Sequence, residues 1–120
     1  MDGRVRDTMN ALAPPRTIRS AERTDGMPRF LIEREIPGIG TQERKAYQEA
    51  SQKSNEVLNA MQAEKKKIQW EHSYVTKDAT LCVYLAESED LILEHSRRSG
   101  FPANRITLVR RLIDPVTAER

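Results

Sequence analysis

The sequence predicts one α+β domain with the element order β-α-β-β-α-β, in which a four-stranded antiparallel sheet carries two helices on one face. Four segments alternate apolar and polar residues, as strands do, and two repeat their less polar residues every three or four positions, as helices do. Glycine and proline stand between these segments and predict turns. A chain of 120 residues suits a single such domain. This arrangement is the ferredoxin-like sandwich.

The first predicted strand begins at Phe30. Phe30 and Ile32 point to one face, residues 31, 33 and 35 point to the other, and Pro37-Gly38 ends the strand. Thr41 is placed to be the N-cap of the first helix. The buried stripe of that helix consists of residues that recur at spacings of three and four, namely Tyr47, Ala50, Ser54, Val57, Leu58 and Met61.

Two alternating segments, 68–76 and 80–86, predict a central hairpin with a three-residue loop over 77–79. That loop pairs Thr76 with Thr80, so Tyr74 is expected opposite Cys82 and His72 opposite Tyr84. One face of the hairpin then collects Trp70, His72, Tyr74, Cys82 and Tyr84. The other face collects Val75, Leu81, Val83 and Leu85, and we expect this apolar face to lie under the helices.

The second helix has Ser88 as its predicted N-cap and Gly100 as its left-handed end. His95 lies near the apolar stripe of this helix, which favours a core histidine over a metal ligand or a proton carrier. A fourth strand is predicted over residues 106–113, before Asp114-Pro115 ends the regular structure.

The predicted domain spans residues 29–115, between a disordered arm over 1–28 and a short tail over 116–120. Residues 1–29 hold six arginines against four acidic residues, which accounts for the net charge of +2. The rest of the chain is neutral overall and has no excess of basic residues to neutralise phosphates. We therefore expect no nucleic-acid partner.

The chain is expected to be cytoplasmic. No segment approaches the roughly 20 apolar residues that cross a bilayer, so no membrane partner is expected. The arm lacks the apolar stretch of a secretory signal. The single cysteine, Cys82, excludes an internal disulfide and fits a reducing compartment.

The polar and aromatic face of the hairpin is the candidate functional surface. An uncovered face with Trp, two Tyr and a Cys predicts that two copies of the chain associate through it as a homodimer. Glu33 and Glu35 of the first strand are expected on the same face, close to His72 and Cys82. Imidazole with carboxylate or thiolate suits nickel, zinc or copper. The alternative is a plain dimer interface, in which His and Tyr make ordinary hydrogen bonds.

Catalysis is left open by the sequence, and a non-catalytic protein is favoured, because no motif of nucleophilic, phosphate-binding or dinucleotide-binding sites occurs. Two further hypotheses remain. One is a cofactor-independent enzyme of the oxygenase or isomerase type, with a cleft lined by His72, Tyr74 and Tyr84. The other is an interaction module that docks through its N-terminal arm.

Four separated segments resemble a bacterial domain of unknown function that includes a small nickel-binding protein. They are residues 33–38 (EREIPG), 70–75 (WEHSYV), 82–84 (CVY) and 95–103 (HSRRSGFPA). The resemblance runs from about Pro28 to Val109 and implies a ferredoxin-like fold, dimerisation and, for some members, nickel binding without known catalysis. It adds His95 to the candidate metal ligands, which are then Glu33, Glu35, His72, Cys82 and His95.

Overall fold

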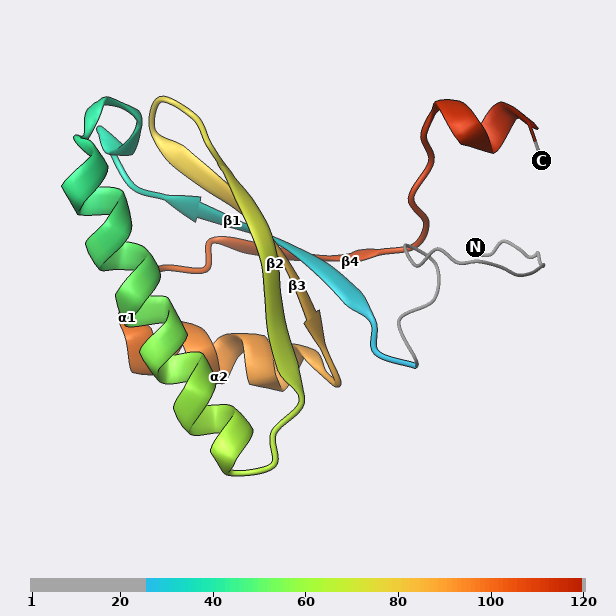
Figure 1. Ribbon diagram of the computed structural model, residues 1–120, viewed down its shortest axis with the longest axis horizontal. Coiled ribbons are helices and arrows are strands. Elements are labelled where there is room, and N and C mark those ends of the chain that lie inside the picture. Colours follow the sequence, from blue (N-terminus) through green and yellow to red (C-terminus); the bar gives the residue numbers. More distant parts are fainter. Residues whose placement is uncertain (1–25, 120) are drawn as a thin grey trace. The chain divides into compact units, whose positions relative to one another are not determined.

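Figure 1 shows a computed structural model of the protein, which describes residues 26–119. The predicted order of elements is confirmed. The strands and helices are β1 (Arg29–Glu35), α1 (Arg44–Ala63), β2 (Ile68–Val75), β3 (Ala79–Ala86), α2 (Glu89–Ser99) and β4 (Arg105–Val109). Two short 3-10 helices, η2 (Ile39–Thr41) and η3 (Pro115–Glu119), complete the structure.

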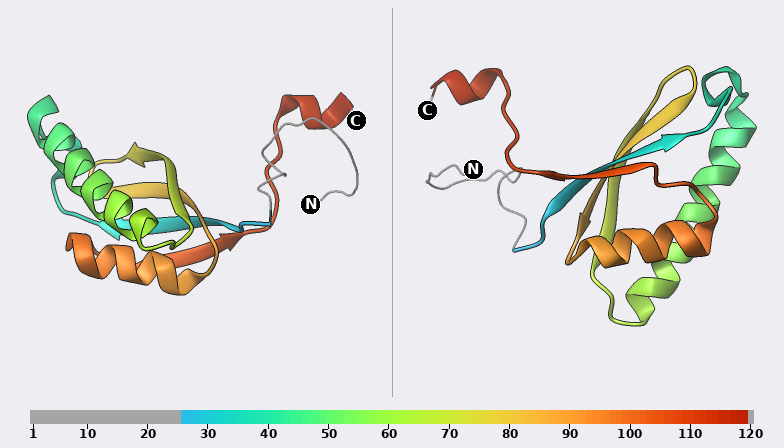
Figure 2. Two further views of the ribbon diagram at one scale, coloured as in Figure 1. Left: turned by 60° about the horizontal axis from the view of Figure 1, so that its bottom comes forward. Right: turned by 180° about the vertical axis from the view of Figure 1, so that it is seen from behind.

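The sheet has the strand order β2-β3-β1-β4, and β3 pairs antiparallel with both β1 and β2. Both long helices lie on one face of it, side by side, as Figures 1 and 2 show. The predicted ferredoxin-like α+β fold is therefore confirmed. The core fills the space between the helices and the sheet and consists of Phe30, Ile32, Val57, Leu58, Met61, Ile68, Cys82, Tyr84, Ala86 and Ile92.

The helix-covered face of the sheet carries one row of alternate side chains from each strand. We use this name for the face formed by Phe30, Ile32, Arg34, Ile68, Trp70, Ser73, Val75, Thr80, Cys82, Tyr84 and Ala86. The helix-free face is the opposite one, formed by Arg29, Leu31, Glu33, Glu35, Gln69, His72, Tyr74, Leu81, Val83 and Leu85. The names refer to the compact unit Met27–Leu108.

The hairpin register differs from the predicted one, and the reason is a β-bulge. Trp70 pairs with Tyr84, but the next paired residue of β2 is His72, opposite Val83, so Glu71 is an extra residue in β2. The turn is also different, because Thr76 N–H donates to the carbonyl of Ala79 at 2.8 Å and the last pair is Val75 with Thr80. The predicted pairs of Tyr74 with Cys82 and His72 with Tyr84 are therefore wrong.

The bulge also decides which side chains the helices cover. Trp70 lies before the bulge and shares the helix-covered face with Tyr84, whereas His72 and Tyr74 lie after it on the helix-free face. The predicted gathering of all five polar and aromatic side chains on one face is therefore wrong. The prediction that Leu81, Val83 and Leu85 lie under the helices is wrong too, because β1 places Phe30 and Ile32 beside Tyr84 and Cys82.

The helices follow the sequence pattern closely. The buried residues of α1 are Ser54, Val57, Leu58 and Met61, all from the predicted stripe, whereas Tyr47 and Ala50 of that stripe are half-buried. Helix α2 has Ser88 as its N-cap and ends at Gly100, which has a φ of +83°. Thr41 is not the N-cap of α1, because it belongs to η2 and the helix begins after Glu43.

The loop before α1 is fixed against the hairpin turn, and this contact explains the late helix start. Gly40 N–H donates to the carbonyl of Lys77 at 2.9 Å, and Gly38 N–H donates to Asp78 Oδ1 at 2.8 Å. A Cβ on Gly40 would lie 2.5 Å from the carbonyl oxygen of Thr76, so only glycine allows this approach. The loop is therefore held in place at one end of the sheet.

Among the described residues, the chain divides into the unit Met27–Leu108 and a second unit that includes residues 109–119. In the second unit, η3 follows Asp114, whose Oδ1 accepts a hydrogen bond from Thr117 N–H at 3.1 Å. Strand β4 ends at Val109 rather than at residue 113. The predicted disordered arm lies, up to residue 25, outside the described residues. No helix within residues 26–119 is long and apolar enough to cross a membrane.

Candidate functional site

The five predicted metal ligands lie on two sides of the sheet. Glu33, Glu35 and His72 are on the helix-free face, Cys82 is on the helix-covered face, and His95 is buried in α2. Within residues 26–119, no three His, Cys, Asp or Glu side chains gather closely enough to hold a metal ion. The expected convergence of carboxylate, imidazole and thiol in one chain therefore does not occur.

On the helix-free face, the carboxylates and the imidazole stand on different strands. Glu33 pairs across β1 and β3 with Leu81, and its carboxylate lies 3.8 Å from Arg105 Nε. The ring of His72 meets the ring of Tyr74 edge to face at 5.2 Å. Strand β3 runs between β1 and β2, and Glu33 and His72 pair with residues two positions apart in β3, so their backbones lie roughly 12 Å apart. Tyr74 is 61% exposed beside them.

His95 is a core histidine, and its predicted place on the apolar stripe of α2 is confirmed. It is 1% exposed, and its Nε2 lies 3.2 Å from Ser54 Oγ. Burial, and then the positive charge of Arg34, lowers the pKa of His95 to about 4. The imidazole is therefore neutral at neutral pH. Its Nδ1 is buried without a hydrogen-bond partner among the described residues.

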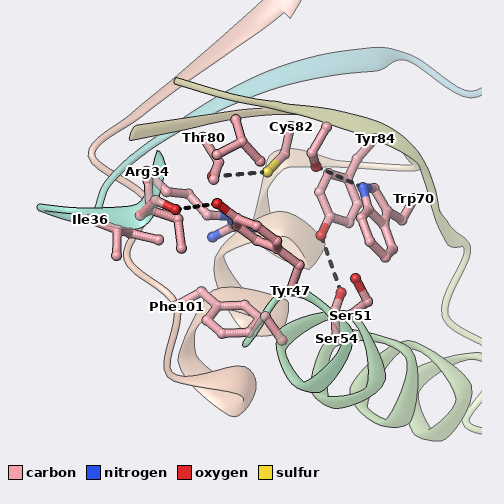
Figure 3. Close-up of a pocket in the computed structure, with 14 residues that line it drawn as sticks. Arg34, Ile36, Tyr47, Ser51, Ser54, Trp70, Thr80, Cys82, Tyr84 and Phe101 are labelled. Carbon is pink, nitrogen blue, oxygen red and sulfur yellow. Dashed lines mark hydrogen bonds between the residues drawn. The ribbon is translucent and has the colours of Figure 1, made fainter. Parts of the chain in front are cut away.

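A pocket of about 210 Å³ lies between α1 and the helix-covered face, as Figure 3 shows. Its lining is mainly aromatic and aliphatic and comprises Arg34, Ile36, Ile39, Tyr47, Ala50, Ser51, Ser54, Trp70, Ser73, Val75, Thr80, Cys82, Tyr84 and Phe101. The cleft expected from the sequence was to be lined by His72, Tyr74 and Tyr84. Of these three, only Tyr84 lines the pocket.

Arg34 is the charged residue of this pocket, and sequence reasoning did not single it out. It is 2% exposed, and its Nη1 donates to Ser96 Oγ at 3.0 Å and to the carbonyl of Pro102 at 2.7 Å. The rings of Tyr84 and Phe101 flank the guanidinium, with centroids 5.8 and 5.9 Å from Cζ. Nη2 is buried and has no hydrogen-bond partner among the described residues.

The polar groups around Arg34 are neutral. Burial raises the pKa of Tyr84, whose hydroxyl lies 3.5 Å from Ser54 Oγ, so the phenol stays protonated at neutral pH. Trp70 Nε1 donates to Ser73 Oγ at 2.9 Å. Cys82 is buried, with Sγ 3.4 Å from Thr80 Oγ1. The arrangement therefore offers one fixed cation inside an apolar cavity.

A family model described as "Nickel responsive protein SCO4226-like" matches residues 30–109. The chain belongs to this family. The resemblance seen in the sequence is thus confirmed, including its span. The crystal structure of SCO4226 from Streptomyces coelicolor A3(2) has a similar fold, with a TM-score of 0.58 and 16% sequence identity. The alignment covers 71% of this chain and 99% of SCO4226.

At this identity the structural likeness to SCO4226 shows the fold alone. No curated protein sequence matches the chain. The description of the family links it to nickel.

Proposed function

We propose that this protein binds a divalent transition metal such as nickel, as a homodimer joined through the helix-free faces of two copies. The family name supports the metal, because the matching family is described as nickel responsive. The observation that carries the proposal is the position of His72. This imidazole shares the helix-free face with the carboxylates of Glu33 and Glu35.

The number of histidines limits how a metal site can be built. The whole chain has two histidines, and His95 is 1% exposed with Nε2 next to Ser54. His72 is therefore the one imidazole that an ion from solution can reach. A site with two imidazoles, a common arrangement for nickel, zinc or copper, requires two copies of the chain.

One copy of the chain does not provide a complete metal site. No group of three suitable side chains occurs within residues 26–119, and β3 separates Glu33 from His72. A second copy, placed face to face by a two-fold axis, brings its own His72 and carboxylates to the same surface. Cys82 and His95 lie on the other side of the sheet and are left out of the proposed ligand set.

The composition of the helix-free face supports a second copy as its partner. Its centre is apolar, with the half-buried residues Leu31, Leu81, Val83 and Leu85. Charged groups of both signs stand around this centre, including Glu33 with Arg105 and Glu71 with Arg29. A surface with an apolar centre and both charges at its edge is self-complementary under a two-fold axis.

The experiment is isothermal titration of Ni²⁺ into metal-stripped protein that carries no affinity tag. We expect saturable binding with one ion for two chains, and its loss in His72→Ala. Gln69→Ala is the matched control, because Gln69 is an exposed residue of the same strand and face. Binding that is unchanged in His72→Ala contradicts the proposed ligand.

A second variant tests the role of the dimer. Val83→Asp places a charge at the centre of the helix-free face without touching a proposed ligand, so it should give a monomer that binds nickel poorly. Sedimentation equilibrium measures the oligomeric state of the same samples. A wild-type protein that is monomeric and yet binds one ion per chain contradicts the shared site.

A further inference from the structure

The second feature that calls for a ligand is the pocket under α1, on the opposite side of the sheet from the proposed metal site. Arg34 brings a full positive charge into it. Within residues 26–119 no acidic side chain pairs with this guanidinium, because the adjacent Glu33 and Glu35 point to the helix-free face. A buried charge without a counter-charge is costly, and such groups are normally paired.

The guanidinium is held in one orientation by groups that do not neutralise it. Ser96 and the carbonyl of Pro102 both accept from Nη1, and Tyr84 and Phe101 flank the plane. Figure 3 shows Arg34 among the residues that surround the cavity, with Phe101 near it. Nη2 is buried and has no hydrogen-bond partner among the described residues, so the positive charge beside the cavity is left without compensation. This is a preorganised site for an anion.

The charge of the site limits the charge of its ligand. Arg34 is the one charged side chain in the pocket lining, and the histidine packed behind Tyr84 is neutral. One guanidinium matches the charge of a monoanion such as a carboxylate. Ser51, also in the lining, has a hydroxyl without a hydrogen bond among the described residues and can bind a second polar atom.

The walls limit the rest of the ligand. The rings of Trp70 and Tyr84 are stacked with centroids 6.4 Å apart, and Tyr47 is fixed by donating to the carbonyl of Ile39 at 2.6 Å. Apolar cavities of about 150 Å³ bind benzene, so a pocket of about 210 Å³ holds one ring and a carboxylate. The aromatic walls favour a flat apolar body.

We propose that the pocket between α1 and the helix-covered face binds a small monocarboxylate with a flat apolar body, whose negative charge is balanced by the guanidinium of Arg34. The proposal is independent of the metal site, because no proposed metal ligand lines this pocket. It also gives Arg34 a role in binding rather than in folding.

The test uses sodium benzoate as the probe and benzamide as its uncharged counterpart, in buffer with a chelator so that metal ligation cannot contribute. Trp70 is the single tryptophan of the chain and lines the pocket, so its fluorescence reports occupancy directly. We expect saturable 1:1 binding of benzoate, and binding of benzamide weaker by about tenfold or more. Equal binding of the two probes, or no saturable binding of benzoate, overturns the proposal.

Two variants separate the contribution of the positive charge from that of the free space in the pocket. Arg34→Gln should weaken benzoate binding by about tenfold or more and remove the preference over benzamide. Ser51→Leu should block both probes by filling the cavity. Arg105→Gln, on the opposite side of the sheet, is the matched control and should bind benzoate as the unaltered chain does.

Two further results overturn the proposal: benzoate binding that persists in Arg34→Gln, and benzoate binding that Ser51→Leu leaves unchanged. If Arg34→Gln does not fold, the ratio of benzoate to benzamide binding in the unaltered protein and the Ser51→Leu result decide. Failure of these tests leaves the nickel titration unaffected, so the two proposals stand or fall separately.

Discussion

The two faces of the sheet differ in a way that the residue types alone do not suggest. In β3 the helix-covered row is Thr80, Cys82, Tyr84 and Ala86, and the helix-free row is the more apolar Leu81, Val83 and Leu85. The covered row is accommodated because the helices supply polar partners, such as Ser54 and His95 beside Tyr84. The apolar row has no such cover within residues 27–108. The contrast supports the proposal that a second copy of the chain, rather than a helix, covers the apolar row.

The largest difference between the faces should appear in stability. Ile32 is fully buried on the helix-covered face, so Ile32→Ala should lower the free energy of unfolding by about 3 kcal/mol. Leu31→Ala, at the adjacent residue on the other face, should cost about 1 kcal/mol or less in dilute protein. Urea denaturation at low protein concentration measures the free energy of unfolding of both variants. Equal losses would mean that the helix-free face is as well covered as the core.

The next effect is a pH dependence that comes from the helix-covered side. Folding lowers the pKa of His95 from 6.5 to about 4, so the unfolded chain takes up a proton first as the pH falls. This part of the stability is complete above pH 6.5 and is lost as the pH approaches 4, by about 3 kcal/mol. Urea denaturation at several pH values shows the slope. His95→Asn should reduce it, and a slope unchanged in that variant would rule out His95 as its origin.

A substitution of Arg34, on the same helix-covered face, tests whether this residue serves binding or folding. Arg34→Met removes the buried charge and keeps the length of the side chain, at the cost of two hydrogen bonds from Nη1. The free energy of unfolding should therefore change by less than about 1.5 kcal/mol in either direction. Thermal and urea unfolding both measure this change. A loss of about 3 kcal/mol or more would make Arg34 a structural residue.

The smallest effect should come from the surface of the helices, away from both faces. Glu64 and Glu94 form ion pairs with Arg98 and Lys66, and hydrogen bonds from Arg98 and Lys66 lower the pKa of Glu64 to about 2. The stabilisation is present above about pH 4.5 and is lost as the pH falls toward 2. Because these groups are exposed, salt should screen the effect. Glu64→Gln should unfold like the unaltered chain in 1 M salt, and a difference that persists there would contradict screening.

Local patterns predicted most of the fold. The alternation of Phe30 and Ile32 with Glu33 and Glu35 placed β1 correctly, and the spacing from Ser54 to Met61 gave the buried side of α1. Gly100 marked the end of α2 because its left-handed backbone favours glycine. These features depend on neighbouring residues, which the sequence displays directly.

The candidate site could not be predicted in the same way, because it depends on pairing between strands. One extra residue at Glu71 reverses the face of everything that follows it in β2, and no residue there signals a bulge. The signal for Arg34 was present. It continues the buried row of Phe30 and Ile32 at the same spacing of two, which puts a charge where an apolar residue is expected.

The central proposal is that the helix-free face binds nickel and the helix-covered face binds a carboxylate. One experiment on the unaltered protein with labelled methyl groups tests it. Ni²⁺ and benzoate are added in separate NMR titrations. Nickel should perturb the methyl groups of Leu81 and Val83 on the helix-free face most strongly, and benzoate those of Ile36, Ile39 and Val75 in the pocket. The account is contradicted if both ligands perturb the same methyl groups, or if nickel acts on the pocket and leaves the helix-free face unchanged.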